Sequence, residues 1–203
     1  IHCTLFNLLF YYVRQNYYMK IEQKIKNITF LFKGTLLKFY LILHGCRVGS
    51  NLKCKRFPVF RSIPKGNIFI GDNVNIGFRI TFDINNKGSL TVGNRTNFTQ
   101  DIIISSIDSI EIGSDVLIAE YVSIRDGDHQ IQIGIKINQQ SLSKKNIKIG
   151  NDVWIGAGTR ILKGAILANG CVIGANSLVL AKTYTKENNV YAGSPIKMIR
   201  NRV

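Results

Sequence analysis

A single histidine in the C-terminal two thirds of this chain has neighbours suited to acid–base chemistry. His129 follows Asp126 and Asp128 in the segment Arg-Asp-Gly-Asp-His-Gln at 125–130, whereas His2 and His44 lie in the N-terminal third. A neutral imidazole can remove a hydroxyl proton at neutral pH, and an adjacent carboxylate can set its tautomer. We therefore predict that His129 is a general base, with Asp126 and Asp128 orienting it or holding the acceptor.

The elements that must position His129 are the short strands of a repeat. An aliphatic residue recurs at every sixth position over residues 149–179, namely at Ile149, Ile155, Ile161, Leu167, Ile173 and Val179. Neither an α-helix nor a half-buried strand keeps this step, whereas hexapeptide repeats are typical of a parallel β-helix. The earlier markers Val48, Ile70, Val92 and Ile112 are 22, 22 and 20 residues apart, which predicts upstream coils with small insertions.

Alternation within the strands predicts which side chains point outward. Val153 and Ile155 flank Trp154, so Trp154 should point outward. The same rule places four further side chains outside, those of Arg160, Ile166, Val172 and Leu178. Val172 comes one coil after Trp154 and should lie over it, and the apolar outer surface that results predicts contact between subunits. Gly, Asn and Asp follow most markers and suit the corners, because they tolerate positive φ.

The repeat breaks at the predicted base. The register of Ile112, Ile118 and Ile124 would bury residue 130, but residues 125–130 are polar and the next clear marker is Ile149. We predict a protruding loop over residues 130–146, since chemistry is commonly placed on loops of a rigid scaffold. The chain then divides into a helical N-terminal segment (1–44), a β-helix (45–183) and a tail or short helix (184–203).

The N-terminal third is basic and rich in aromatic residues. The formal net charge of the chain is +15, and residues 1–66 hold twelve Lys and Arg residues against Glu22 alone. Lysine with Phe, Tyr and Leu suits an anionic membrane surface better than nucleic acid. Apolar side chains every three or four positions predict a helix over residues 20–43, which either lies in a membrane interface or caps the β-helix. Lys33 and Lys38 interrupt its apolar stretch, so it is not expected to span a membrane.

Composition favours one well-buried domain inside the cell. The chain has 203 residues and 45% apolar content, and its four cysteines form no Cys-x-x-Cys pair. Cys171 falls on a small position of the repeat, which predicts a free buried thiol and a reducing compartment. No cleavable signal peptide is evident, and Met19 leaves open whether residues 1–18 belong to the native chain. We expect a cytoplasmic protein, with peripheral contact at the inner face of the cell membrane.

At three stretches the chain resembles the hexapeptide-repeat acyltransferases. These stretches are Ile-Lys-Ile-Gly-Asn-Asp-Val-Trp-Ile-Gly-Ala at 147–157, Val-Ile-Gly-Ala-Asn-Ser at 172–177, and Val-Tyr-Ala-Gly-Ser-Pro-Ile-Lys at 190–197. The resemblance covers roughly residues 68–200 and implies a homotrimer of left-handed β-helices. It further implies transfer of an acetyl group from acetyl-CoA to a hydroxyl or an amine.

Carried over to this chain, the resemblance implies roles for single residues. His129 matches the catalytic base, and Trp154 matches a Trp beside the active site of polysaccharide O-acetyltransferases. Cofactor-binding positions fall on five residues: Ala157 and Ala175 at the pantetheine arm, and Lys182, Lys197 and Arg200 at the CoA phosphates. Bare backbone along the arm and cations at the phosphates suit the chemistry of CoA.

These observations predict an acetyl-CoA-dependent O-acetyltransferase acting on a sugar hydroxyl of a cell-surface polysaccharide or its precursor. The sugar-binding residues of small-sugar acetyltransferases do not align with residues 101–107, so the acceptor is left open. The alternatives are an N-acetyltransferase acting on an amino-sugar nucleotide or a small xenobiotic, and a non-catalytic scaffold. A γ-type carbonic anhydrase would need three histidines on zinc, and the body holds one, so no metal is expected.

Overall fold

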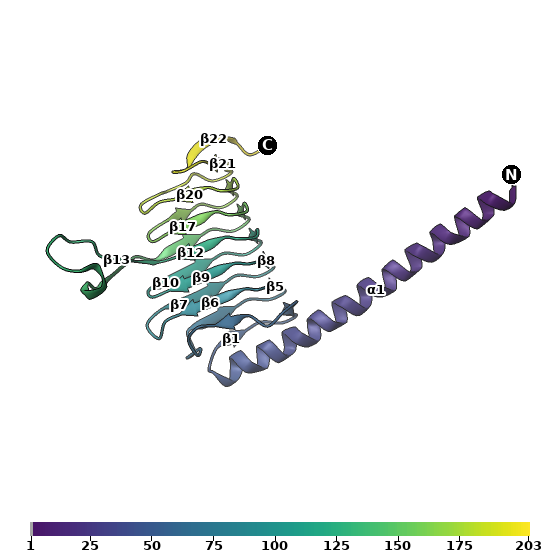
Figure 1. The fold of residues 1–203 in the computed structure, drawn as a ribbon, viewed down its shortest axis with the longest axis horizontal. Helices are drawn as coiled ribbons and strands as arrows, with labels where there is room; N and C mark the ends of the chain where they lie inside the picture. The colour runs from purple at the N-terminus through teal and green to yellow at the C-terminus, as the bar shows by residue number, and fades with distance from the viewer. Residues whose placement is uncertain (1) are drawn as a thin grey trace.

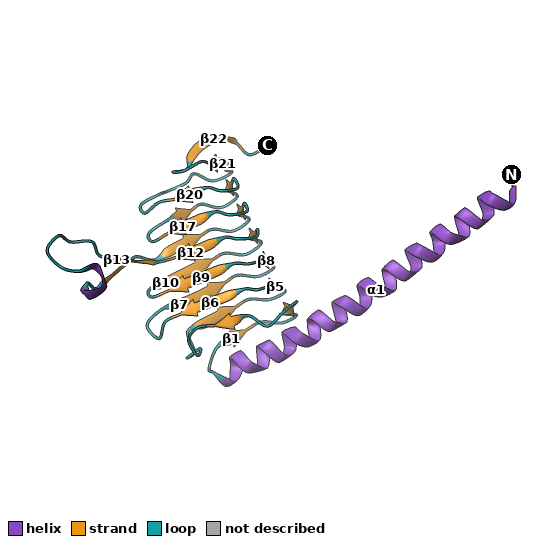
Figure 2. Ribbon diagram, viewed as in Figure 1, coloured by secondary structure: helices purple, strands orange, loops and turns teal. Residues whose placement is uncertain are grey.

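The computed structural model describes the backbone of residues 2–203 and the side chains of residues 18–203. A long helix, α1 (His2–Leu43), leads into a tall stack of short strands, from which one hairpin projects (Figures 1 and 2). The strands of successive coils pair in parallel, so that the chain winds through three sheets in turn. This arrangement confirms the predicted parallel β-helix.

The three sheets form the walls of the stack. The first contains β1 (Arg47–Val48), β4 (Ile68–Ile70), β7 (Ser89–Val92), β10 (Ser109–Ile112), β15 (Ile147–Ile149) and β18 (Ile166–Leu167). The second contains β2 (Lys53–Cys54), β5 (Asn75–Phe78), β8 (Asn97–Gln100), β11 (Leu117–Ile118), β16 (Trp154–Ile155), β19 (Val172–Ile173), β21 (Asn189–Ala192) and β22 (Lys197–Asn201). The third contains β3 (Val59–Phe60), β6 (Thr81–Ile84), β9 (Ile103–Ser106), β12 (Ser123–Arg125), β17 (Arg160–Leu162) and β20 (Leu178–Val179).

The core is a column of aliphatic side chains that the repeat supplies. The six markers from Ile149 to Val179 are each at most 2% exposed. In the outward direction Trp154 pairs with Val172 and Arg160 with Leu178, as the alternation predicts. Cys171 is a free and buried thiol, also as predicted.

The hairpin is inserted without breaking the column. Strand β10 pairs directly with β15, with Ile110 opposite Ile147 and Ile112 opposite Ile149. The residues between these strands include β11 and β12 of the same coil, and then β13 (Gly127–His129), the 3-10 helix η1 (Ile137–Gln139) and β14 (Leu142–Lys144). The insertion therefore sits at one corner, between the third sheet and the first.

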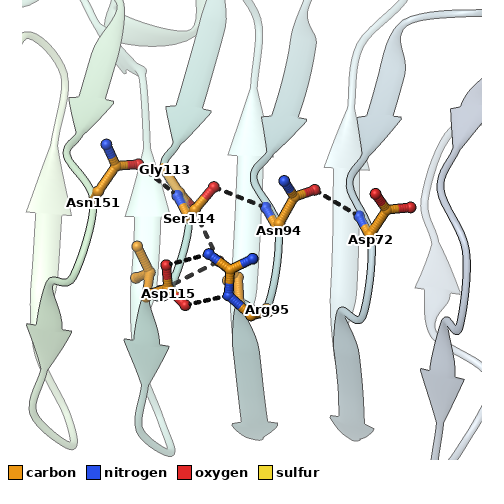
Figure 3. Close-up of polar contacts among 9 residues, drawn as sticks. Asp72, Asn94, Arg95, Gly113, Ser114, Asp115 and Asn151 are labelled. Atoms are coloured by element: carbon orange, nitrogen blue, oxygen red, sulfur yellow. Dashed lines mark hydrogen bonds and ion pairs between the residues drawn. The ribbon is translucent and has the colours of Figure 1, made fainter.

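A ladder of short polar side chains holds the corner between the first and second sheets together (Figure 3). The backbone N–H of Asp72 donates to Asn94 Oδ1 (2.7 Å), that of Asn94 to Ser114 Oγ (3.0 Å), and that of Ser114 to Asn151 Oδ1 (2.8 Å). Each side chain thus satisfies a corner donor that the strands leave unpaired. The ladder explains why Asn, Asp and Ser follow the glycines of the repeat.

Four positive-φ positions among the described residues depart from the expected residue types, namely Arg79, Arg95, Tyr121 and Lys182. Arg95 has φ +55°, a conformation expected for Gly, Asn or Asp. Its guanidinium donates two hydrogen bonds to the Asp115 carboxylate, at 2.6 and 2.7 Å, one coil above (Figure 3). These bonds lower the pKa of Asp115 below its ordinary value. The bidentate pair offsets the strain that a side chain meets at this φ.

The end of helix α1 caps the first coil. Leu37 and Leu41 are fully buried against it, and Gly34 lies so close that an added Cβ would fall 1.7 Å from the carbonyl oxygen of Leu52. Lys38 Nζ donates to the carbonyl oxygen of Gly49 (2.8 Å), which accounts for one lysine in the apolar stretch. The capping interpretation is therefore correct for this end. Within the described residues, no helix is both long enough and apolar enough to cross a bilayer.

The C-terminal segment corrects one prediction. No helix forms over 184–203 in the described structure; instead β22 folds back antiparallel onto β21, with Ala192 opposite Lys197 and Val190 opposite Arg200. The physical reason is the edge of the second sheet at β21, whose backbone groups would otherwise lack partners. A closing hairpin supplies them, which a helix could not do.

Candidate active site

The predicted base lies on the projecting hairpin, at the rim of a cleft. Strand β13 pairs antiparallel with β14, which places His129 opposite Leu142. The hairpin leaves the stack to one side, well away from the N-terminal end of α1 (Figure 1). The cleft at its root has a volume of about 450 Å³ and is lined by Asp83, Asn85, Ser105, Ile107, Arg125, Asp126, Gly127, Asp128, His129 and Leu142.

Asp126 anchors the root of this hairpin. Its side chain is fully buried, and its carboxylate accepts hydrogen bonds from Ser106 Oγ (2.6 Å), Ile107 N (2.8 Å) and Asp108 N (3.0 Å). Its own carbonyl oxygen accepts from the N–H of Lys145 on the returning chain (2.9 Å). Asp126 therefore ties the hairpin to the corner of the coil below, and its carboxylate is already engaged within the protein.

Asp128 and His129 are both exposed. The carboxylate of Asp128 lies 3.5 Å from Lys163 Nζ, and within the described side chains no group is hydrogen-bonded to the His129 ring. Neither Asp126 nor Asp128 is hydrogen-bonded to the His129 ring in this structure. The orienting role predicted for them is therefore not seen. Both ring nitrogens of His129 are free to meet a ligand in the cleft. An imidazole in this position can accept a proton from a hydroxyl group bound there.

A polar column on the third sheet lines the same cleft and was missed by the sequence reasoning. Asp83, Ser105 and Arg125 occupy matching positions on β6, β9 and β12. Ser105 Oγ donates to Asp83 Oδ2 (3.2 Å), and Arg61 Nη1 lies 3.6 Å from the same oxygen. The signal was available: these three residues follow one another by 22 and 20 positions, the same steps that separate the markers of the upstream coils.

Trp154 lies on another face of the stack. It is 52% exposed and belongs to β16 in the second sheet. The hairpin, in contrast, begins directly after β12, which is a strand of the third sheet. Its neighbours in register are Leu117 and Val172, and together they line a separate, mainly apolar cleft of about 310 Å³. A single chain therefore does not bring Trp154 and His129 into one site.

The predicted CoA-binding residues lie in two separate places on the stack. Ala157 and Ala175 follow β16 and β19 at the corner between the second and third sheets, where Asn176 N donates to the carbonyl oxygen of Ala157 (2.7 Å). Lys197 and Arg200 are exposed on β22, which continues the second sheet at its top. Lys182 follows β20 of the third sheet and so stands at a different corner. The structure groups the first four on one side of the stack and separates Lys182 from them.

Comparison with known proteins identifies the class to which this fold belongs. The model of the bacterial transferase hexapeptide (six repeats) family matches residues 146–181. A solved structure of AntD, an N-acyltransferase from Bacillus cereus in complex with dTDP and coenzyme A, superposes with a TM-score of 0.66 at 20% identity, over 77% of this chain and 84% of that one. The likeness shows a shared fold. The hexapeptide repeats imply that this fold is a left-handed β-helix.

Two relatives carry the comparison to the family. A putative lipopolysaccharide biosynthesis O-acetyl transferase of Escherichia coli, WbbJ, is 32% identical over 158 residues, which span 74% of this chain and 79% of that protein. A probable acetyltransferase of Mycobacterium tuberculosis is 34% identical over 134 residues, or 66% of this chain, but these span only 44% of that relative. The chain belongs to the hexapeptide-repeat acyltransferase family.

Proposed function

We propose that this protein transfers an acetyl group from acetyl-CoA to a sugar hydroxyl of a cell-surface polysaccharide or its precursor. The observation that carries the proposal is the exposed His129 ring, which has no hydrogen-bond partner among the described side chains and lies at the rim of a cleft lined mainly by polar residues. A family of acyltransferases needs a group that takes the proton from its acceptor, and His129 is the side chain suited to that step at neutral pH. The E. coli relative named for O-acetyl transfer in lipopolysaccharide biosynthesis supports the acceptor class.

The mechanism follows from these groups. His129 removes the hydroxyl proton while the acceptor oxygen attacks the thioester carbonyl carbon, and a backbone N–H stabilises the oxyanion of the tetrahedral intermediate. The carbon–sulfur bond then breaks, and the proton on His129 passes to the departing CoA sulfur. The products are an acetyl ester and CoA, without a covalent acyl-enzyme.

The acceptor would be held by the polar column below His129. Asp83 and Ser105 face the cleft from adjacent coils, and Arg125 continues the column to the root of the hairpin. Carboxylate, hydroxyl and guanidinium groups can together hydrogen-bond the hydroxyls of a sugar ring. A sugar precursor of this class would meet the enzyme at the inner face of the cell membrane. The basic, aromatic composition of the N-terminal segment predicts that the protein is held there.

We propose that the complete site needs a second copy in a homotrimer. His129 and Trp154 lie on different walls of one chain, and the outer side chains of Leu117, Trp154 and Val172 form an apolar column that a neighbouring copy would cover. Ala157, Ala175, Lys197 and Arg200 lie on or beside that same wall. CoA would then run along the junction, with its phosphates at Lys197 and Arg200 and its thioester near His129 of the adjacent copy.

N-acylation is the second candidate. The N-acyltransferase AntD shares the fold, and its structure holds a nucleotide and coenzyme A. Besides Asp126, which is engaged within the protein, the cleft is lined by two carboxylates, Asp83 and Asp128, that would suit the ammonium form of an amino sugar. Acceptor competition distinguishes the two candidates: an amino-sugar nucleotide acetylated faster than neutral glycans would favour the amine.

The test is acetyl transfer by purified protein with His129→Ala and a matched control. Release of CoA thiol from acetyl-CoA is followed with glycan acceptors, and mass spectrometry of the product shows where the acetyl group is attached. Loss of a positioned base lowers turnover by about a hundredfold to ten-thousandfold, while CoA binding is kept. His44→Gln, at the base of the stack, should leave turnover within a few-fold. Turnover by His129→Ala close to that of the control contradicts the assignment, and absence of acetyl-CoA binding by calorimetry favours the non-catalytic scaffold.

A further inference from the structure

Helix α1 has two apolar faces, and the β-helix covers only one of them. Leu37 and Leu41 are buried against the first coil, and Gly34 is in direct contact with the backbone at Leu52. Phe39 lies between Leu37 and Leu41 in sequence, two residues from each, which places it about 200° away around the helix axis. It is 62% exposed. The second face therefore points away from the body of the protein.

This second face forms a continuous exposed stripe. Five large side chains separated by three, four or seven residues belong to it, and each is between 58% and 67% exposed: Ile25, Ile28, Phe32, Phe39 and Leu43. At 1.5 Å per residue the stripe is about 27 Å long. Monomeric soluble proteins rarely leave a continuous apolar surface of this size in water, so we expect a partner to cover it.

The charges beside the stripe decide which partner fits. Over residues 18–43 the chain has five lysines and one acidic residue, Glu22, which is already paired with Lys26 (2.6 Å). Lys20 and Lys24 are exposed, and neither forms an ion pair with a described side chain, because Glu22 is paired with Lys26. A second copy of the stripe would bring lysines against lysines, whereas an anionic surface would pair with them.

We propose that the exposed stripe docks on an anionic lipid bilayer. The five apolar side chains would enter the boundary between headgroups and acyl chains, and Lys20 and Lys24 would extend to the lipid phosphates. The capping face stays against the β-helix, so docking requires no change in the fold. This inference concerns where the protein is held and goes beyond the reaction proposed above, so either proposal can fail without the other.

Flotation with lipid vesicles tests the docking. The full chain is mixed with phosphatidylcholine vesicles that contain or lack phosphatidylglycerol, and the bound fraction is measured. We expect binding to the anionic vesicles and little to the neutral ones. The stripe variant Ile25→Gln/Ile28→Gln/Phe32→Gln should abolish it. The control variant Ile131→Gln/Ile133→Gln/Ile135→Gln removes three isoleucines of the hairpin that are each at least 50% exposed, and it should bind as the unmodified chain does.

A second variant separates charge from apolar contact. Lys20→Gln/Lys24→Gln should weaken binding to anionic vesicles by about tenfold to thirtyfold, since each lysine near such a surface contributes roughly a fivefold factor. Equal binding of the stripe variant and the unmodified chain would overturn the proposal. The proposal would also be overturned if the stripe variant had a lower molecular mass by light scattering than the unmodified chain and bound vesicles equally well. In that case a second copy of the chain would cover the stripe. Circular dichroism of each variant checks that the helix is retained.

Discussion

Replacing Asp126 should both destabilise the protein and displace the proposed base, His129. The Asp126 carboxylate is fully buried and accepts three hydrogen bonds, from Ser106 Oγ and from the N–H groups of Ile107 and Asp108. Asp126→Ala removes all three and leaves two backbone donors without a partner. Hydrogen bonds to a charged group are worth about 1.5–3 kcal/mol each, but losses within one network are not additive, so we expect about 3–5 kcal/mol of lost stability.

The catalytic effect should be distinct from the loss of stability. Because His129 is three residues from Asp126 on the same hairpin, loosening the root should lower kcat, while the KM for acetyl-CoA changes by less than a few-fold. Urea unfolding gives the stability, and turnover is measured well below the unfolding transition. Asp126→Asn, which keeps one acceptor oxygen, should lose less stability and less kcat than Asp126→Ala. An Asp126→Ala protein that unfolds within 1 kcal/mol of the unmodified chain, as judged against the expected 3–5 kcal/mol, would refute the anchoring role.

Three further changes follow from the structure. The Arg95 guanidinium holds the pKa of Asp115 below its ordinary value, so this pair contributes stability above the unfolded-state pKa of Asp115 and loses it as the pH falls through the folded-state pKa. The difference in unfolding midpoint between the unmodified chain and Arg95→Ala should therefore shrink in acid. A difference that stays constant with pH would contradict the pairing. Gly113→Ala should cost about 2–3 kcal/mol in urea unfolding, because its Cβ would lie 2.6 Å from the carbonyl oxygen of Gly150. Gly134→Ala would meet no atom within 4 Å, so it should cost only the backbone strain of a side chain at φ +90°, about 1–2 kcal/mol. Lys197→Ala/Arg200→Ala should raise the KM for acetyl-CoA about tenfold with kcat little changed, and an unaltered KM would remove these cations from the proposed CoA site.

Local patterning was sufficient to predict the scaffold. The six-residue step determines the inward positions, and alternation then places Trp154 and Val172 on the outer face, one above the other. Both inferences need only the geometry of a strand and the length of a coil. The interruption at residue 130 could be read for the same reason, since a polar run cannot continue a buried column.

Contacts between coils were harder to predict. Asp126 looks like a turn residue beside His129, yet its partners lie 18–20 residues earlier in the chain, at a corner whose N–H groups need an acceptor. Asp83 and Ser105 are ordinary polar residues on the outer side of their strands, and only their offset of 22 positions joins them into a column. The C-terminal hairpin depends on the open edge of a sheet that no local pattern reveals.

The position of the hairpin explains how this fold can carry a site at little energetic cost. Each coil contacts only the coils above and below it, so stability is close to a sum over neighbouring pairs. Ile112 pairs with Ile149, so this contact between coils is kept although the two residues are 37 positions apart in sequence. In the next coil the paired residues Ile149 and Leu167 are only 18 positions apart. Doubling the length of a closed loop costs only about 0.6 kcal/mol, which is small beside the burial of one isoleucine. The hairpin that bears His129 can therefore change in length beyond its Asp126 anchor while the coils that hold it stay the same. Under the proposed function, acceptor preference can then vary on a constant scaffold.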